Sequence, residues 1–344
     1  CDRPVLSRAL RRRRSRIEMP PTLQTKVRPG EAGQLLHAWL CARFRYFDAA
    51  GWSAQLAAGR VELAGKPAHG DERLAAGDRI AFVPAASDPG PTPGQDVPVL
   101  FADDHLVVVD KPPHLVVQHE AAFPQFTFAP RLNERLPPTY GQPRLEPVHR
   151  LDRETSGVLV LARSPRGWRG MQRQFERHAI DKRYLAVVHG QVADDERELV
   201  AAIGLHPHSA LPTRRAVVPD GTKGSKPART SLRVRQRFAD ATLVELHPTT
   251  GRTHQLRVQL EHLGHAIVGD KLYGHDDARH LRYLAHLKAD GDPRWPEECA
   301  VGRQLLHAWR LSCRHPCSGE PMVFTAPWPA DLAAFVQARG GHVD

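Results

Sequence analysis

The stretch that decides the fold lies near the middle of the chain and comprises His149-Arg150-Leu151-Asp152-Arg153-Glu154-Thr155-Ser156-Gly157, followed by Val158-Leu159-Val160-Leu161-Ala162. A short polar loop ends at a glycine and leads into a run of apolar residues that is typical of a buried strand. We therefore expect Asp152 to stand on the rigid edge of a sheet, a position that catalytic side chains often occupy. The alternative is a surface loop in which Asp152 only pairs with Arg150 and Arg153.

A second polar segment begins with Gly251-Arg252-Thr253-His254-Gln255-Leu256-Arg257 and extends to Asp270. Thr253 is expected to cap a helix that turns Leu256, Leu260 and Leu263 inward. Arg257 would then lie on the flank of this helix, where it can reach a carboxylate from another segment.

Two groups of residues have side chains of the types that bind metals. The first is His254, His262, His265 and Asp270, but the His-Glu-x-x-His spacing of zinc enzymes is absent. The second is Cys313, His315 and Cys317, which lack the second cysteine pair that a structural zinc site normally needs. We therefore expect ordinary polar histidines and free thiols at these positions, and no metal.

The chain around the polar segments is rich in short strands. Apolar patterns predict strands over 106–109, 158–162, 184–188, 230–237 and 242–246, and helical spacing predicts an amphipathic helix over 169–178. One domain over residues 97–344, built on a mixed or antiparallel β-sheet, accommodates these elements. The expected fold class is therefore α+β.

A smaller α/β unit is predicted over residues 31–86. Its first helix is indicated by apolar residues at helical spacing, namely Leu35, Leu36, Trp39, Leu40 and Phe44. A second short helix is expected over 53–58, and alternating residues predict strands over 60–65 and 79–83. Residues 87–96 are rich in proline and glycine and are interpreted as a linker. The basic residues 1–30 are interpreted as a disordered arm.

The net charge of +10 favours a polyanionic partner, and nucleic acid is the commonest one in a cytosol. Seven arginines against Asp2 and Glu18 give residues 1–18 a net charge of +5, which is half of the total. The first methionine is Met19, so we hypothesise that translation of the natural protein starts there.

Several classes of protein are disfavoured by the composition. The five cysteines are odd in number and scattered, which argues against a disulfide-stapled secreted fold. We find neither a signal peptide nor the roughly 18 uncharged apolar residues that a membrane helix needs. The expected location is the cytoplasm, with no membrane association.

The two polar segments, together with smaller motifs in the same order, resemble the RluA-type pseudouridine synthase family. The first is similar to the family's His-Arg-Leu-Asp-x-x-Thr-Ser-Gly signature, and residues 251–274 are similar to its Gly-Arg-Thr-His-Gln-[Leu/Ile]-Arg…Gly-Asp…Tyr-Gly signature. Shorter matches are Asp110-Lys111-Pro112, Lys182-Arg183-Tyr184-Leu185-Ala186-Val187-Val188-His189-Gly190, Leu305-Leu306-His307-Ala308 and His315-Pro316. The resemblance covers about residues 97 to 328, and ordered motifs of this length are specific.

The resemblance implies an isomerase that detaches uracil from its ribose, turns it, and rejoins it through carbon-5. Asp152 would be the nucleophile, Arg257 the cation that keeps it ionised, and Tyr184 the ring that stacks on the base and assists proton transfer. Expected contacts to substrate or RNA are His149, Arg150, Lys111, Arg252 and His254. The implied partner is ribosomal or transfer RNA, with no cofactor, no metal and no obligate protein partner, and the protein is expected to be a monomer.

Some features depart from the family pattern or match it loosely. Pro113 and His114 stand where the family has a small residue and a glycine, and Gln259 stands where it has histidine. Residues 33–86 resemble an S-four-type RNA-binding domain only through their Gly-Arg-Val…Gly-Lys and Gly-Asp-x-Ile elements.

Two other functional classes compete with the isomerase interpretation. An RNA-binding or assembly factor would carry the same fold with a vestigial centre, which the presence of Asp152, Tyr184 and Arg257 together argues against. A hydrolase of nucleosides or phosphoesters would use Asp152 with the histidines, and it predicts metal dependence or release of free uracil.

Overall fold

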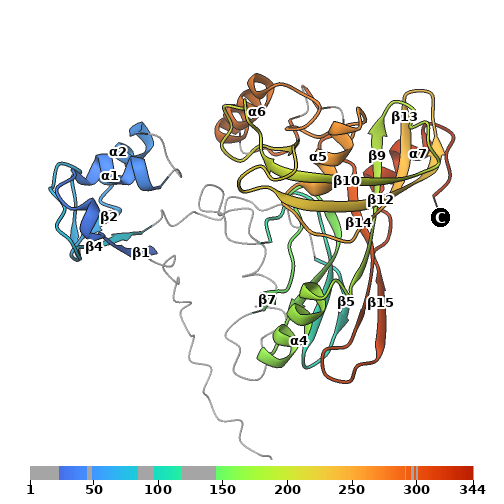
Figure 1. Ribbon diagram of the computed structural model, residues 1–344, viewed down its shortest axis with the longest axis horizontal. Coiled ribbons are helices and arrows are strands. Elements are labelled where there is room, and N and C mark those ends of the chain that lie inside the picture. Colours follow the sequence, from blue (N-terminus) through green and yellow to red (C-terminus); the bar gives the residue numbers. More distant parts are fainter. Residues whose placement is uncertain are drawn as a thin grey trace, which may run out of the picture. The chain divides into compact units, whose positions relative to one another are not determined.

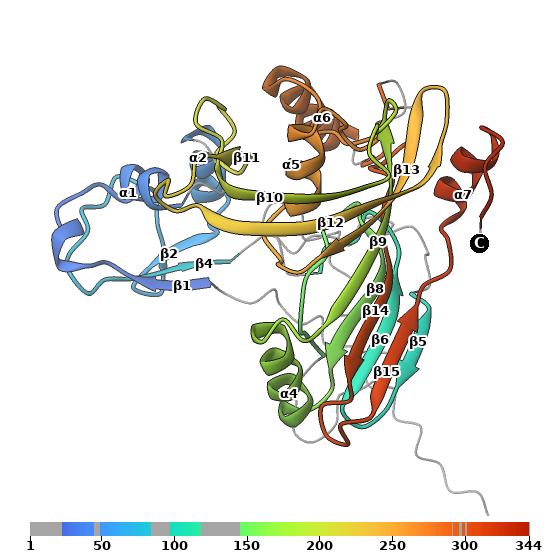
Figure 2. The same cartoon turned by 45° about the vertical axis from the view of Figure 1, so that its right-hand side comes forward.

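The computed structural model describes residues 23–44, 49–83, 97–117, 145–290, 292–295, 298–299 and 301–343. The described residues form two compact units, one over 23–83 and one from residue 97 onward (Figures 1 and 2). The predicted linker, the run of arginines and the hypothetical start at Met19 lie outside the described residues. In the described part of the chain, no helix is long and apolar enough to cross a membrane.

The small unit pairs two helices with an antiparallel sheet of strand order β1-β4-β2-β3. The strands are β1 (Leu23–Lys26), β2 (Val61–Leu63), β3 (Lys66–Pro67) and β4 (Arg79–Phe82). The two helices are α1 (Leu36–Arg43) and α2 (Ala49–Ala57), and a short 3-10 helix, η1 (Pro29–Glu31), precedes them. Trp39 and Trp52 are almost fully buried in its core, which confirms the inward face expected for the first helix.

Two predictions for this unit were wrong at their edges. The arm was predicted to reach residue 30, but Leu23–Lys26 form a strand that pairs with β4. A strand of four residues is too short for its alternation of apolar and polar side chains to be recognised in the sequence. Its partner, β4, lies more than 50 residues further along the chain. Leu35 is largely exposed, because it precedes α1 as its N-cap instead of lying on its inner face.

The large unit is built on an eleven-stranded mixed sheet with order β11-β10-β12-β13-β9-β14-β8-β6-β5 among the described residues, with β7 beside β8 and β15 beside β14. Its strands are β5 (Val99–Ala102), β6 (Leu106–Lys111), β7 (Glu146–Pro147), β8 (Ser156–Ala162), β9 (Asp181–His189), β10 (Glu196–Leu205), β11 (Arg215–Val218), β12 (Lys226–Arg237), β13 (Ala241–Pro248), β14 (Leu306–Arg314) and β15 (Pro321–Thr325). Its helices are α4 (Pro165–Glu176), α5 (Gln255–His262), α6 (Asp277–Asp290) and α7 (Ala330–Gln337). The α+β fold class, with a small N-terminal α/β unit, is confirmed.

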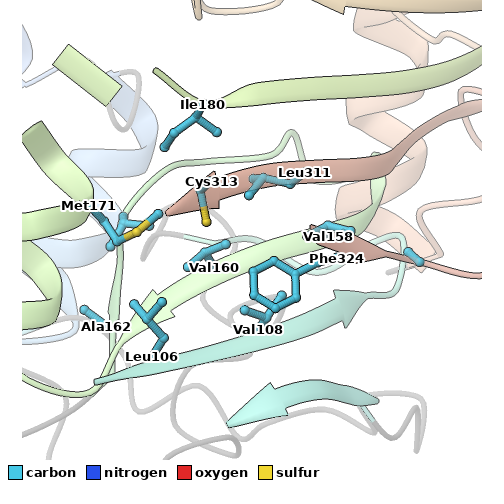
Figure 3. Close-up of a cluster of buried hydrophobic side chains, with 12 residues drawn as sticks. Leu106, Val108, Val158, Val160, Ala162, Met171, Ile180, Leu311, Cys313 and Phe324 are labelled. Carbon is cyan, nitrogen blue, oxygen red and sulfur yellow. The ribbon is translucent and has the colours of Figure 1, made fainter. Parts of the chain in front are cut away.

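Strands β6 and β8 are buried on both faces, which explains their continuous apolar sequences. One face joins a core that contains Val107 and Leu159. The other face carries Val108 and Val160 and packs against Met171 of α4, as Figure 3 shows. The buried strand predicted directly after the Asp152 loop is thereby confirmed.

The close contact between β8 and β14 fixes where the Asp152 loop ends. These strands run parallel, with Ala308 opposite Gly157. Gly157 has φ +111°, and a Cβ on it would lie 2.2 Å from the carbonyl oxygen of Ala308. Only glycine suits this position, because it tolerates the positive φ and permits the close backbone approach.

Several elements of the large unit differ from the predictions. Helix α4 begins at Pro165, four residues earlier than expected, because Ser164 caps it and proline suits its first position. The elements that were not predicted are strands β5, β7, β10, β11, β14 and β15 and helices α6 and α7. The exposed face of β10 and the mixed composition of α6 hide their periodicity.

Candidate active site

A cavity of about 260 Å³ opens in the large unit, and most of its lining comes from three separate segments of the chain. The Asp152 loop forms one wall, the start of β9 with Lys182 and Tyr184 a second, and residues 248–257 a third. Asp152, Tyr184 and Arg257 all line it, so the structure brings together the three side chains predicted to be catalytic.

Arg257 lines this cavity and links two carboxylates. Its Nη1 donates a hydrogen bond to Oδ2 of Asp152 at 3.0 Å. Its Nε and Nη2 donate to Oδ2 and Oδ1 of Asp270 at 2.6 and 2.8 Å. The expected flank position of Arg257, within reach of a carboxylate from another segment, is confirmed. The bidentate pair with Asp270 fixes the plane of the guanidinium group and leaves one edge for Asp152.

Asp152 is the carboxylate that remains accessible. Its side chain is 19% exposed, whereas that of Asp270 is fully buried. Burial acts to raise the pKa of Asp152, but His254, which is charged only in acid, and the guanidinium groups of Arg257 and Arg150 outweigh it, so the pKa lies below its ordinary value. Burial lowers the pKa of His254 to about 4, so His254 is neutral at pH 7. The permanently charged guanidinium groups therefore keep Asp152 ionised at neutral pH.

Asp270 and Tyr273 are site residues that our sequence reasoning did not assign. Oδ1 of Asp270 also accepts hydrogen bonds from the backbone N–H groups of Leu272 and Tyr273. The Tyr273 ring lies against Arg257, with 4.8 Å between the guanidinium carbon and the ring centroid. The Gly-Asp…Tyr-Gly part of the second signature was the signal that could have identified both residues.

Tyr184 stands on β9 and packs against two of the hydrophobic clusters of the large unit. Burial, followed by the negative charge of Asp152, raises the pKa of its phenol. The phenol is consequently protonated at neutral pH. Tyr184 offers an aromatic face and a hydrogen-bond donor beside Asp152.

The loop before α5 is ordered by Gln255 and not by the predicted Thr253 cap. His254 holds the N-cap position with φ +56°, and no side chain caps the helix. The amide of Gln255 accepts hydrogen bonds from the backbone N–H of Arg252 and the hydroxyl of Thr250, and donates to the carbonyl of Arg229. The Thr253 prediction was wrong because the left-handed turn at His254 redirects the chain before the helix begins.

Four of the five expected contacts to substrate line the cavity. Arg150 is exposed, and Arg252 is half-buried with its Nε donating to the carbonyl of Pro227 at 3.0 Å. Nδ1 of His254 lies 2.8 Å from the Tyr273 hydroxyl. Nε2 of His149 accepts a hydrogen bond from the backbone of Val160, and burial lowers the pKa of His149 to about 3. His149 therefore shapes the cavity wall as a neutral ring.

Lys111 is the exception, and its expected contact with RNA is contradicted by its position. The side chain is completely buried at the end of β6. Its Nζ donates to the carbonyl oxygens of Pro112, Leu115 and Arg153, at 2.8 to 3.1 Å. Three acceptors match the three donors of an ammonium group, so Lys111 ties the Asp152 loop to the 112–115 turn.

The 112–115 turn contains Pro113 and His114, the residues that depart from the family's small residue and glycine. His114 adopts φ +66°, the left-handed conformation that a glycine would take without strain. The turn is thus formed with an unfavourable residue. The second departure, Gln259, faces away from the cavity and hydrogen-bonds Thr230 and the carbonyl of Leu199.

A second ionic network lies under the same loop. Glu154 accepts hydrogen bonds from Lys271 at 2.8 Å and from the hydroxyl of Tyr283 at 3.2 Å. Arg303 donates to the carbonyl oxygens of Glu154, Gln304 and Leu306, and forms a bidentate pair with Asp331. Glu154, Lys271, Tyr283 and Arg303 are buried and Asp331 is partly exposed, and none of them lines the cavity.

The histidines and cysteines that raised the question of a metal are dispersed. Asp270 is bound to Arg257, and His265 hydrogen-bonds the carbonyl of His189. Cys313 is buried in the core beneath α4, and His315 pairs with Asp103 at 2.9 Å. No three histidine, cysteine, aspartate or glutamate side chains among the described residues are grouped to hold a metal ion.

Comparisons with known sequences agree on one family. Residues 105–262 match the RNA pseudouridylate synthase family. The chain is 38% identical over 241 residues to ribosomal large subunit pseudouridine synthase D of Nitrosomonas europaea, an alignment that covers 70% of this chain and 64% of that protein. It is 36% identical over 317 residues to the protein of the same name from Xanthomonas campestris pv. campestris, and covers 92% of both chains. The family match does not reach residues 33–86, where the S-four-type resemblance stays a prediction.

Solved structures show the same fold for the large unit. Human RNA pseudouridylate synthase domain containing 4 matches with a TM-score of 0.56 and 23% identity, over 72% of this chain and 94% of its own. Human RNA pseudouridylate synthase domain containing 1 matches with a TM-score of 0.51 and 25% identity, over 73% of this chain and 98% of its own.

Proposed function

Because this chain belongs to the RluA-type family of RNA pseudouridine synthases, which are isomerases, we propose that it converts a uridine of ribosomal RNA to pseudouridine with Asp152 as the nucleophile. The observation that carries the proposal is an accessible, ionised carboxylate held by Arg257 in a cavity that an aromatic ring also lines. Ribosomal RNA is proposed because the relatives that cover most of this chain are named ribosomal large subunit pseudouridine synthases.

The chemistry requires a group that can bond to carbon and later leave. A carboxylate does both, as in retaining glycosidases, and a covalent adduct of Asp152 with the ribose or the base frees the uracil to turn. Arg257 stabilises the carboxylate before attack and when it is released. The bidentate hold of Asp270 on Arg257 keeps that guanidinium from swinging over Asp152 and blocking it.

The neighbouring side chains would position the base. Tyr184 stacks on the uracil, and its protonated phenol can take up the proton that carbon-5 loses while it gives its own proton to the released carboxylate of Asp152 beside it. His254 is held by Tyr273 as a neutral ring that can share a hydrogen bond with the uracil edge. Arg150 and Arg252 supply charge at the cavity wall for the phosphates beside an extruded nucleotide. We propose that the small unit also binds RNA and so increases the affinity.

Mapping pseudouridine in RNA from a strain that lacks this protein tests the proposal. One or more pseudouridines in large-subunit ribosomal RNA should disappear, and should return with the wild-type gene but not with Asp152→Ala. If a pseudouridine disappeared from transfer RNA instead, the substrate would be transfer RNA and not ribosomal RNA. A map with no change, or rescue by Asp152→Ala, would support the RNA-binding factor with a vestigial centre. Release of free uracil in vitro would support the hydrolase.

A further inference from the structure

Helix α4 presents a continuous row of arginines to solvent. Arg166, Arg169, Arg173 and Arg177 are all exposed. Their spacing of three or four residues keeps them within an arc of about 80° on a helix of 3.6 residues per turn, along a length of roughly 16 Å. We call these four residues the arginine face. The only acidic residue of the helix is Glu176.

The charges of the arginine face have no counter-ions in the described part of the chain. None of its four guanidinium groups hydrogen-bonds or pairs with a carboxylate there. Arginines elsewhere behave differently, because Arg197 pairs with Asp194, Arg233 with Glu196 and Arg339 with Asp240. A row of unpaired like charges repels itself, and such an arrangement favours binding of a polyanion.

The opposite face of α4 holds the helix rigidly on the sheet. Met171 is fully buried among the strands (Figure 3). Gly167 and Gly170 allow the helix to approach His105 and Pro316 so closely that an added Cβ would clash at 2.3 and 2.5 Å. Gln174 exchanges two hydrogen bonds with the backbone of Arg314. The arginines therefore project from a fixed platform, which lowers the entropy lost on binding.

The helix also reaches the catalytic cavity. Phe175 of α4 lines that cavity, two residues before the last arginine of the row. Its ring lies against His149, with 5.3 Å between the ring centroids. An RNA strand that places one nucleotide in the cavity must continue past its rim, and α4 forms part of that rim.

We propose that the arginine face of α4 binds the phosphate backbone of the substrate RNA next to the nucleotide that enters the cavity. This proposal rests on the proposed function and adds a docking surface to it. Guanidinium groups suit the task because they bind phosphate bidentately and stay charged. The face reads backbone and not base identity, so it contributes affinity and orientation but no sequence preference.

The test compares two triple variants that lose the same charge. Arg166→Gln/Arg169→Gln/Arg173→Gln removes most of the arginine face. Arg197→Gln/Arg233→Gln/Arg339→Gln removes three arginines that are already paired, of which Arg197 and Arg233 are exposed and Arg339 is half-buried. Affinity for an unmodified large-subunit ribosomal RNA transcript is measured over a range of salt, and pseudouridine formation is followed on the same transcript.

The arginine-face variant should raise Kd and KM by roughly 10- to 100-fold, and should lower the slope of log K against log salt by about 3, one per lost phosphate contact. Its kcat should stay within about twofold of wild type, since no cavity residue changes. The paired-arginine control should change each quantity less than about threefold. Arg166→Lys/Arg169→Lys/Arg173→Lys should recover most of the affinity, because charge is retained.

Equal affinities and equal salt slopes for the two Gln triples would overturn the proposal, and would leave an acidic protein surface as the occupant of α4. Failure of the proposed function looks different. In that case the wild-type protein forms no pseudouridine in any RNA, while the affinity and salt slope of the variants still decide whether the arginine face binds RNA.

Discussion

Two carboxylates of the same loop, Asp152 and Glu154, have opposite surroundings. Asp152 faces the cavity, and in the described part of the chain its carboxylate accepts a hydrogen bond only from Nη1 of Arg257, at 3.0 Å. Glu154 faces the interior and is held by Lys271, Tyr283 and the backbone N–H of Gln304. For both groups burial raises the pKa, nearby cations outweigh that effect, and the pKa lies below its ordinary value.

The difference shows how a buried ion network can serve either chemistry or structure. A carboxylate that is enclosed in the interior, with both oxygens hydrogen-bonded, cannot attack a substrate, whereas one with free lone pairs beside a cavity can. Breaking the occupied network leaves uncompensated buried charges, and this destabilises the fold. Removing the free carboxylate leaves Arg257 still paired with Asp270.

The largest expected effect is on catalysis by Asp152→Asn. The amide keeps the size of the side chain but loses the nucleophile, so pseudouridine formation should fall by at least about 10⁴-fold. The free energy of unfolding should change by less than about 1 kcal/mol, because Arg257 retains Asp270. Single-turnover assays and urea unfolding measure the two quantities. A residual rate within tenfold of wild type would exclude Asp152 as the nucleophile.

Glu154→Gln is the matched substitution two residues away, and it should do the reverse. It leaves the buried Lys271 without a carboxylate, so unfolding should become easier by about 3 kcal/mol. The rate per folded molecule should stay within about tenfold of wild type when measured well below the melting temperature. If this variant were fully stable yet inactive, Glu154 would be a catalytic residue, and the distinction between a catalytic Asp152 and a structural Glu154 would be wrong.

Asp270→Asn should give an intermediate result, since this residue positions Arg257 without lining the cavity. We expect kcat to fall by about 100-fold through misplacement of the guanidinium group, with little change in KM for RNA. A purely structural role predicts a lower melting temperature with kcat per folded molecule unchanged. Steady-state kinetics on protein quantified by native fraction separates the two outcomes.

The stability difference between wild type and Glu154→Gln should depend on pH. The folded-state pKa of Glu154 lies below its unfolded value near 4.5, so its contribution to stability is complete above that pH. The contribution is lost as the pH falls through the folded-state pKa. Urea midpoints for the two proteins should therefore differ most at pH 7 and converge in acid; a gap that widens in acid would contradict the lowered pKa.

The smallest effect is expected in the turn that Lys111 binds. His114 has a positive φ, and its buried Nδ1 has no hydrogen-bond partner in the described part of the chain. His114→Gly should stabilise the protein by about 1 kcal/mol, because it relieves both penalties. His178→Gly is the control, since His178 is exposed and has φ +53°. A loss of stability in His114→Gly alone would mean that the His114 ring makes a favourable contact.

Part of the site could be predicted from local sequence patterns. The apolar run after Gly157 predicted a buried strand, and the helical spacing predicted that Leu256 and Leu260 are buried, although α5 is buried on all sides from Gln255 to Leu260. The signatures identified the three side chains that meet in the cavity. These inferences hold because periodicity and motif order are properties of neighbouring residues, which the chain displays without folding.

The burial of Lys111 could not be predicted from local sequence patterns. A lysine beside a proline in a basic protein is expected to be exposed, yet its ammonium is surrounded by carbonyl groups from two segments. The roles of Glu154 and Asp270 escaped prediction for the same reason, because their partners are distant in sequence or fixed by a turn.

The sequence by itself determined the chemistry that is possible here: a carboxylate, a guanidinium group and a phenol in ordered motifs, together with the strands and helices that carry them. Only the tertiary structure decided which carboxylate stays accessible and which becomes a buried anchor. The physical reason is that burial and ion pairing depend on residues more than 100 positions apart, such as Asp152 with Arg257 and Glu154 with Lys271. No local pattern encodes those distances.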